Sequence, residues 1–242
     1  MIKSRVLLAG ALFVAAAGSA HAGLTVAPAV TSDYDFRGVT QTENKAAFQL
    51  GATYGFDSGA YAGAWLSNVK FGKPPGTSME LDLTGGYTFG DAKEGVAWDL
   101  GGVYYTYSGG TSPSDLNYLE LYAGATHDWF NAKVFYSPDY GGKATTGNTS
   151  AWYVSTTGTF PLPADFSFVA HAGYSVGTYW DKYGKSYLDY SVGVAKTFSN
   201  ITLNVSYVDG SDLPGAPRSQ PFSTVSKVVA TISTTVPWGA AE

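Results

Sequence analysis

Apolar and polar residues alternate along most of the chain in short segments, each bounded by residues that favour turns. Residues 47–57 are the clearest example, since one face of an extended strand there would carry Phe48, Leu50, Ala52, Tyr54 and Phe56. Residues 151–160 and 165–176 repeat this period of two. Because successive side chains of a strand point to opposite faces, the pattern predicts β-strands with one apolar face.

Twelve such strands are predicted along the chain. They cover residues 24–37, 47–57, 60–71, 79–89, 96–108, 118–128, 131–137, 151–160, 165–176, 187–198, 201–208 and 224–238. Most have close to the ~9–11 residues that cross a bilayer at a steep tilt. An even number of strands also allows an antiparallel sheet to close on itself.

The connections between these strands are alternately long and short. The long ones are residues 38–46, 72–78, 109–117, 138–150, 177–186 and 209–223, and the short ones are residues 57–59, 90–95, 129–130, 161–164 and 199–200. A transmembrane barrel has short turns at one rim and longer loops at the other, whereas a soluble sandwich has no reason for this order. The sequence therefore predicts an all-β fold, a closed antiparallel transmembrane β-barrel with short periplasmic turns and longer extracellular loops.

Aromatic residues strengthen this prediction, because alternation alone also suits a soluble β-sandwich. One set lies beside the short turns and consists of Phe56, Phe89, Trp98, Phe160, Phe198 and Trp238. A second set lies toward the long loops and consists of Phe36, Tyr107, Tyr118, Trp152, Tyr187 and Tyr207. Two such sets are expected to form the girdles that flank the lipid-facing band of a membrane barrel.

The beginning of the chain predicts export. Lys3 and Arg5 precede the uncharged residues 6–18, and Ala20-His21-Ala22 forms a small-x-small cleavage site, so residues 1–22 are expected to be a signal peptide. One barrel domain, residues 23–238, and a short tail, residues 239–242, would follow. No stretch reaches the ~20 apolar residues of a membrane-spanning helix. The expected location is the outer membrane of a Gram-negative bacterium.

The net charge of −5 argues against nucleic acid as a partner. Cysteine is absent, so the fold has no disulfides or thiolate metal ligands. His127 and His171 are the candidate bases in the barrel, but Ser175 lies four residues beyond His171, too far along a strand to form a hydrogen-bonded pair. The sequence predicts no catalytic site, metal site or cofactor.

Strand parity directs a set of charged residues to the polar, inward face. They are Asp33, Asp35, Arg37, Glu80, Asp82, Asp99, Glu120, His171, Asp189 and Lys227. Because acidic residues predominate near the expected outer mouth, we interpret the set as candidates for a constriction that favours cations. In an alternative interpretation, Arg37 and Lys227 neutralise neighbouring carboxylates, and the network braces the wall of the barrel.

A twelve-stranded barrel has a narrow lumen at best, so small hydrophilic solutes or ions diffusing passively are the expected cargo. The alternative is a closed structural or surface-binding barrel that works through its outer loops. Those loops contain Lys45, Lys73, Lys143, Lys182, Lys185 and Arg218. This basic belt could bind the phosphates of lipopolysaccharide in the surrounding outer-membrane lipid. The sequence leaves the oligomeric state open.

Three segments, residues 32–41, 63–69 and 80–87, resemble the TorF-type family of outer-membrane porins, Gcw_chp-like bacterial β-barrel proteins. The resemblance covers most of the chain after the predicted signal peptide and is most specific over residues 31–72. After about residue 140, only the general sequence features of a β-barrel are shared. It implies a porin with no assigned substrate and no catalytic residues. Family members tend to end on an aromatic residue that would engage the barrel-assembly machinery, whereas here residues 239–242 follow Trp238.

Overall fold

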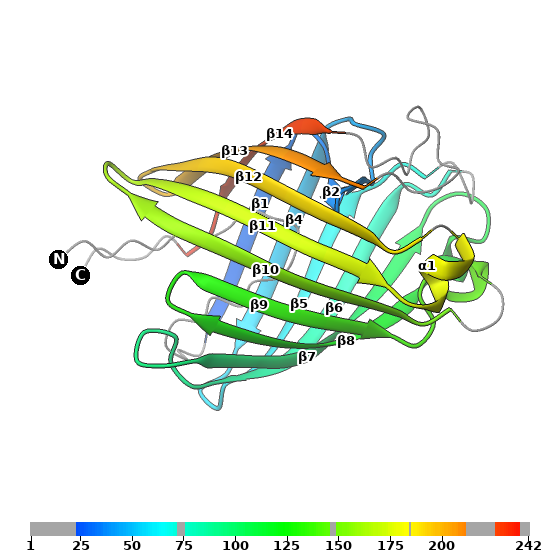
Figure 1. Ribbon diagram of the computed structural model, residues 1–242, viewed down its shortest axis with the longest axis horizontal. Helices are drawn as coiled ribbons and strands as arrows, with labels where there is room; N and C mark the ends of the chain where they lie inside the picture. The colour runs from blue at the N-terminus through cyan, green and yellow to red at the C-terminus, as the bar shows by residue number, and fades with distance from the viewer. Residues whose placement is uncertain (1–22, 72–75, 146–148, 184, 212–225, 238–242) are drawn as a thin grey trace.

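The computed structural model describes residues 23–71, 76–145, 149–183, 185–211 and 226–237. Within these residues twelve antiparallel strands close into a barrel (Figure 1). The strands are β1 (Gly23–Thr31), β4 (Ala47–Gly55), β5 (Ala60–Asn68), β6 (Met79–Phe89), β7 (Ala97–Ser108), β8 (Tyr118–His127), β9 (Phe130–Ser137), β10 (Ala151–Leu162), β11 (Phe166–Val176), β12 (Tyr187–Phe198), β13 (Ile201–Gly210) and β14 (Lys227–Thr234). Each pairs with its neighbour in the sequence, and β1 pairs with β14 to close the wall. The predicted fold class is confirmed.

The two ends of the barrel differ as the loop lengths predicted (Figure 1). Short turns join strands at one end, which we call the turn end. The opposite loop end carries the 3-10 helices η1 (Pro113–Leu116) and η2 (Gly142–Ala144) and the helix α1 (Thr178–Tyr183). Several predicted features lie outside the described residues. They are residues 1–22, Lys73, residues 212–223 with Arg218, and residues 238–242 with Trp238.

No helix among the described residues is long and apolar enough to cross a membrane.

The outer face of the wall is apolar and the inner face is largely polar. In β6, Met79, Leu81 and Leu83 are exposed, whereas the alternate residues Glu80 and Asp82 are buried. The same alternation leaves Phe48 of β4 71% exposed, the highest value among the large apolar side chains of the described residues. An apolar exterior around a polar interior suits a barrel surrounded by lipid.

The first predicted strand, residues 24–37, extends too far along the chain. The wall strand β1 stops at Thr31, and residues 32–46, here called the inner segment, contain the small hairpin of β2 (Asp35–Phe36) and β3 (Val39–Thr40). Arg37 (φ 54°) and Gly38 (φ 78°) adopt consecutive left-handed conformations. Two such residues form the tight turn of this hairpin, which a continuing strand cannot contain, so residues 24–37 are not one straight strand.

The inner segment lies inside the barrel. It contacts β6 through Tyr34, β8 and β12 through Arg37, and β14 through Asp33. These strands lie on different sides of the closed wall. A short segment can reach all of them only from the lumen. The prediction that residues 38–46 form an external loop is therefore wrong for residues 38–42, which are buried, whereas residues 44–46 are exposed at the loop end.

Glycines make room for large inward side chains. Gly101 of β7 lies directly opposite Tyr122 of β8, and a Cβ added to Gly101 would lie 2.6 Å from the Tyr122 hydroxyl. Gly86 of β6 lies opposite Tyr61 of β5 in the same way. The aromatic rings therefore cover bare backbone on the neighbouring strand, an arrangement that also fixes the register.

Candidate functional site

Arg37, at the tip of the inner hairpin, binds Glu120 of β8. Its Nη1 donates to Glu120 Oε1 at 2.9 Å and its Nη2 donates to Glu120 Oε2 at 2.6 Å. The hydroxyl of Tyr105 donates a third hydrogen bond to Glu120 Oε2, at 3.0 Å. Both charged side chains are almost fully buried. A planar, bidentate pair of this kind holds the tip of the hairpin in one orientation.

Aromatic rings surround the Arg37 guanidinium. Its central carbon lies 4.2 Å from the ring centroid of Tyr153 and 5.1 Å from that of Phe135. On the β12 side, the Tyr187 hydroxyl donates to the Arg37 carbonyl oxygen at 3.0 Å. Contacts of a guanidinium with ring faces add cation–π attraction. Arg37 is therefore held from β8, β9, β10 and β12 together.

The base of the inner segment is fixed by Lys227 of β14. The Lys227 ammonium lies 2.8 Å from Asp35 Oδ2 and also contacts Asp33. Asp33 Oδ1 accepts hydrogen bonds from the hydroxyls of Thr40, at 2.6 Å, and Thr42, at 2.8 Å. These contacts link the beginning and the end of the inner segment to each other and to the wall.

Glu80 and Asp82 lie together on the inner face of β6. The Tyr34 hydroxyl donates to Glu80 Oε1 at 3.2 Å. By contrast, Glu80 Oε2, Asp82 Oδ1 and the hydroxyl of Thr84, the next inward residue of the strand, are buried and have no hydrogen-bond partner among the described residues. The inner face of β6 thus presents unpartnered oxygen atoms to the lumen.

His171 and Asp189 come together on neighbouring strands. His171 Nε2 lies 3.2 Å from Asp189 Oδ1, and the Tyr153 hydroxyl donates to the same oxygen at 3.1 Å. The other ring nitrogen, Nδ1, lies 2.8 Å from the Thr157 hydroxyl. Both ring nitrogens therefore contact polar groups of neighbouring strands. These contacts suit a role for His171 in holding the strands of the wall together.

Asp99 belongs to a separate cluster, nearer the turn end. Its Oδ2 accepts from Lys133 at 2.7 Å, and its Oδ1 accepts from the Tyr61 hydroxyl, also at 2.7 Å. The Tyr61 and Tyr122 hydroxyls are hydrogen-bonded, and the Lys133 ammonium lies 4.7 Å from the Tyr122 ring centroid. The ten candidate residues therefore do not all lie in contact with one another. They form several paired groups at different heights in the barrel.

The predicted aromatic girdle at the loop end is only partly right. Trp152 and Tyr207 are exposed on the outer face, but Tyr118 and Tyr187 are buried. Phe36 and Tyr107 pack against buried clusters inside as well. Tyr118 and Tyr187 begin their strands at inward positions, so their rings pack inside the barrel and not in lipid. At the turn end, Phe56, Phe89, Trp98 and Phe198 are exposed as predicted.

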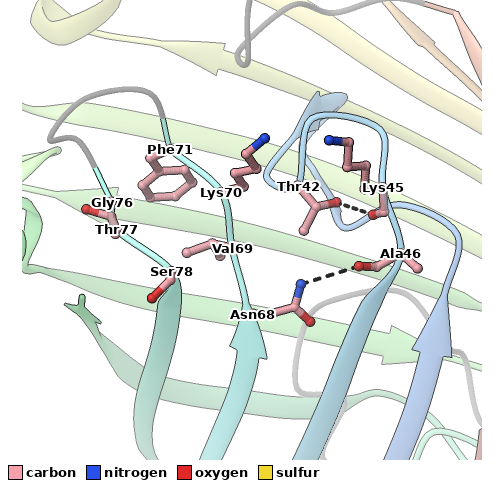
Figure 2. Close-up of a pocket in the computed structure, with 10 residues that line it drawn as sticks. All are labelled: Thr42, Lys45, Ala46, Asn68, Val69, Lys70, Phe71, Gly76, Thr77 and Ser78. Carbon is pink, nitrogen blue, oxygen red and sulfur yellow. Dashed lines mark hydrogen bonds between the residues drawn. The ribbon is translucent and has the colours of Figure 1, made fainter. Parts of the chain in front are cut away.

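A pocket of about 400 Å³ lies at the rim of the loop end (Figure 2). It lies between the end of the inner segment, with Lys45, and the residues that follow β5 and precede β6, including Lys70 and Thr77. The side chain of Asn68 donates to the Ala46 carbonyl oxygen at 3.3 Å and joins the two sides of the pocket (Figure 2). The Lys70 ammonium pairs with Glu43, whose hydrogen bond raises the pKa of Lys70.

Comparison with protein families assigns the chain to one family. A family model described as "Bacterial protein of unknown function (Gcw_chp)" matches residues 15–236. The chain belongs to the Gcw_chp family. The Gcw_chp part of the predicted resemblance is thereby confirmed, whereas the TorF name stays a prediction. Comparison with curated proteins found no match.

Solved structures resemble this Gcw_chp protein in fold. The KdgM porin superposes with a TM-score of 0.53 at 9% identity, over 87% of this chain and 97% of that one. The NanC porin superposes with a TM-score of 0.52 at 13% identity, over 88% and 98% of the two chains. A further structure is described as "KdgM porin in complex with disordered oligogalacturonate", with a TM-score of 0.51 at 9% identity, over 88% and 96% of the chains. Similarity at this level shows a shared barrel architecture.

Sequence reasoning missed several partners of the candidate residues in this Gcw_chp protein. A straight strand over residues 24–37 would place Tyr34 on the outer face, whereas Tyr34 is buried inside the barrel. Tyr61 was not identified, although Gly86 on the neighbouring strand is a signal that room exists for a large ring. The pairing of Arg37 with Glu120 joins residues 83 positions apart, and no local pattern indicates it.

Proposed function

We propose that this Gcw_chp protein is a porin of the Gram-negative outer membrane that lets small hydrophilic solutes or ions diffuse passively, with a modest preference for cations. The observation that carries the proposal is the excess of acid in the outer part of the lumen. Six carboxylates there, Asp33, Asp35, Glu80, Asp82, Glu120 and Asp189, are accompanied by the two strong bases Arg37 and Lys227. An acidic lining of this kind favours cations over anions.

The similar barrels support the channel role by analogy. KdgM and NanC are both described as porins, and KdgM has a structure described as a complex with oligogalacturonate. This chain matches nearly their whole length. We therefore transfer the class of function and leave the identity of the solute open.

The inner segment would be the constriction of this porin. It fills the outer part of the lumen with buried side chains, including Tyr34 and Arg37. A solute that enters from the loop end must pass between this segment and the wall. The segment would therefore limit the size of the cargo, and the carboxylates around it would set the charge preference.

Single-channel recording of the refolded protein in a planar bilayer, under a salt gradient, tests the proposal. Stable conductance steps with a reversal potential on the cation side are expected. Anion preference would contradict the charge argument. An absence of steps, from protein whose heat-modifiable gel mobility demonstrates folding, would refute the porin function.

A closed surface-binding barrel is the second candidate, and the close packing around Arg37 favours it. In that case the rim lysines Lys45 and Lys70 would bind lipopolysaccharide phosphates beside the exposed, lipid-facing Phe48. The variant K45E/K70E would then lose affinity for lipopolysaccharide. Unchanged affinity would reject this candidate.

A further inference from the structure

The two sides of the inner wall differ in the size of their side chains. In the closed order of strands, β5 to β9 lie across the barrel from β11 to β14 and β1. Large aromatic residues point inward from the first side and are buried there, namely Tyr61, Tyr105, Tyr122 and Phe135. On the second side, toward the turn end, small uncharged residues point inward, among them Ser191, Gly193, Asn204, Ser206 and Ser233. We call these five residues the neutral face.

Exposure to solvent shows that the lumen is open along the neutral face. All five of its residues are part-exposed. Their neighbours in the sequence, such as Val192 and Val205, are exposed on the outer face of the wall. Because successive side chains of a strand point to opposite faces, solvent reaches the neutral face through the lumen. Across the barrel, by contrast, Tyr122 is only 7% exposed and Phe135 only 1%.

This open part of the lumen lies on the turn-end side of the inner segment. Along β1, the inward residue Thr31 is 4% exposed, Ala29 is part-exposed, and Ala27 and Thr25 are exposed. Thr31 lies against the inner segment, since its hydroxyl donates to the Asp33 carbonyl oxygen at 2.8 Å. A solute that has passed the inner segment therefore meets the neutral face next.

The chemistry of the neutral face fits a solute that both donates and accepts hydrogen bonds. A serine hydroxyl does both, and so does an asparagine amide. The Ser206 hydroxyl donates to Asn204 Oδ1 at 2.7 Å and orients that amide. Asp189, the inward residue of β12 next to the face, is 2% exposed and contacts Tyr153 and His171, so it adds no accessible charge. A few polar groups of this kind give a site its preference for one class of solute.

We propose that the neutral face is the surface along which uncharged, polyhydroxylated solutes cross the barrel, with sugars of one or two rings as the class that fits. The narrow lumen of a twelve-stranded barrel limits the size of the solute. The acidic lining of the outer lumen disfavours anions, so a sugar acid of the same size should pass more slowly. This inference rests on the proposed porin function and narrows its class of solute.

Swelling of proteoliposomes tests the class of solute. Vesicles that contain the refolded, full-length protein are transferred into an isosmotic solution of glucose or of sodium glucuronate, an anion of similar size. Glucose should enter several-fold faster than glucuronate. Equal rates, or faster entry of glucuronate, would overturn the inference.

Single cysteines test the path, because the chain contains no cysteine of its own. In S206C, a methanethiosulfonate reagent should attach beside Gly193, the direct partner of Ser206, and slow the entry of glucose. The matched control is V103C, which places a cysteine at a buried inward position of β7, across the barrel from β13. The same reagent should leave glucose entry through V103C unchanged. S191C replaces S206C if the latter fails to show heat-modifiable gel mobility.

Three outcomes of the cysteine experiment would overturn the inference. Failure of the reagent to attach to S206C, measured by mass spectrometry, would show that the neutral face is closed to solvent. Attachment without any slowing of glucose entry would place the path elsewhere. Equal slowing in S206C and V103C would show that neither side of the lumen is preferred.

Single-channel recording of the same preparations separates this inference from the porin function. A barrel that conducts ions but admits no glucose refutes only the inference about sugars. A folded barrel with neither conductance nor glucose entry refutes the porin function, and this inference with it.

Discussion

Arg37 and Glu120 form a buried, bidentate ion pair across the lumen, with the two hydrogen bonds at 2.9 and 2.6 Å. The pair joins the tip of the inner hairpin to the barrel wall, and Tyr105 supports it from β7. Together with the contacts of Lys227 at the base of the segment, this pair fixes the inner segment to the wall. The position of this segment then decides how much of the lumen is free.

Replacement of Arg37 by Ala should therefore loosen the inner segment. It leaves Glu120 buried without its counter-charge, and breaking a buried pair on one side costs about 3–5 kcal/mol. Urea unfolding of the refolded barrel should show a loss of this order, and single-channel conductance should rise. The double variant R37A/E120Q removes the orphaned charge and should recover part of the stability. No recovery would mean that the ring contacts of Arg37, and not the ion pair, hold the hairpin.

The whole inner segment can be removed without changing the wall. Thr31 and Ala47 are direct partners in the pairing of β1 with β4, so a two-residue Asn-Gly turn can replace residues 32–46. The shortened barrel should fold, and its conductance should exceed that of the wild type several-fold if the segment is the constriction. A folded deletion variant with wild-type conductance would place the narrowest point elsewhere, with the Asp99–Lys133 cluster as the next candidate.

The wall was predictable from the sequence because each strand follows a period of two. Glu80 and Asp82 lie on the inner face as their alternation with Met79, Leu81 and Leu83 indicates. The inner segment was not predictable in this way. Its reversal depends on left-handed conformations at Arg37 and Gly38, and distant partners such as Glu120 stabilise it. Local patterns in the sequence therefore predict the strands of the barrel wall. The structure inside the lumen depends on contacts between residues far apart in the sequence, which local patterns do not indicate.

The glycine opposite Tyr122 provides a test of packing inside the barrel. A Cβ at Gly101 would lie 2.6 Å from the Tyr122 hydroxyl and 2.7 Å from the Gly85 carbonyl oxygen. Gly101→Ala should therefore destabilise the barrel by about 1–3 kcal/mol through overpacking. Gly124→Ala is the matched control, because the atoms nearest to its Cβ would be side-chain carbons of Lys133, at 3.0 Å and beyond. Urea unfolding should show a clearly larger loss for Gly101→Ala, and equal losses would contradict the packing argument.

Charge selectivity should depend on Glu80 and Asp82 more than on the other acids, because theirs is the charge that no basic side chain of the described residues offsets. The variant E80Q/D82N keeps the size of both side chains and removes the charge. Its reversal potential under a salt gradient should shift toward anions relative to the wild type. D99N is the matched control. It removes a paired acid and leaves the positive charge of Lys133 without its partner, but this charge lies away from the outer mouth, so the reversal potential of D99N should shift less than that of E80Q/D82N. An unchanged reversal potential in E80Q/D82N would show that these carboxylates do not act as the filter, and that the paired acids around Arg37 and Lys227 set the selectivity.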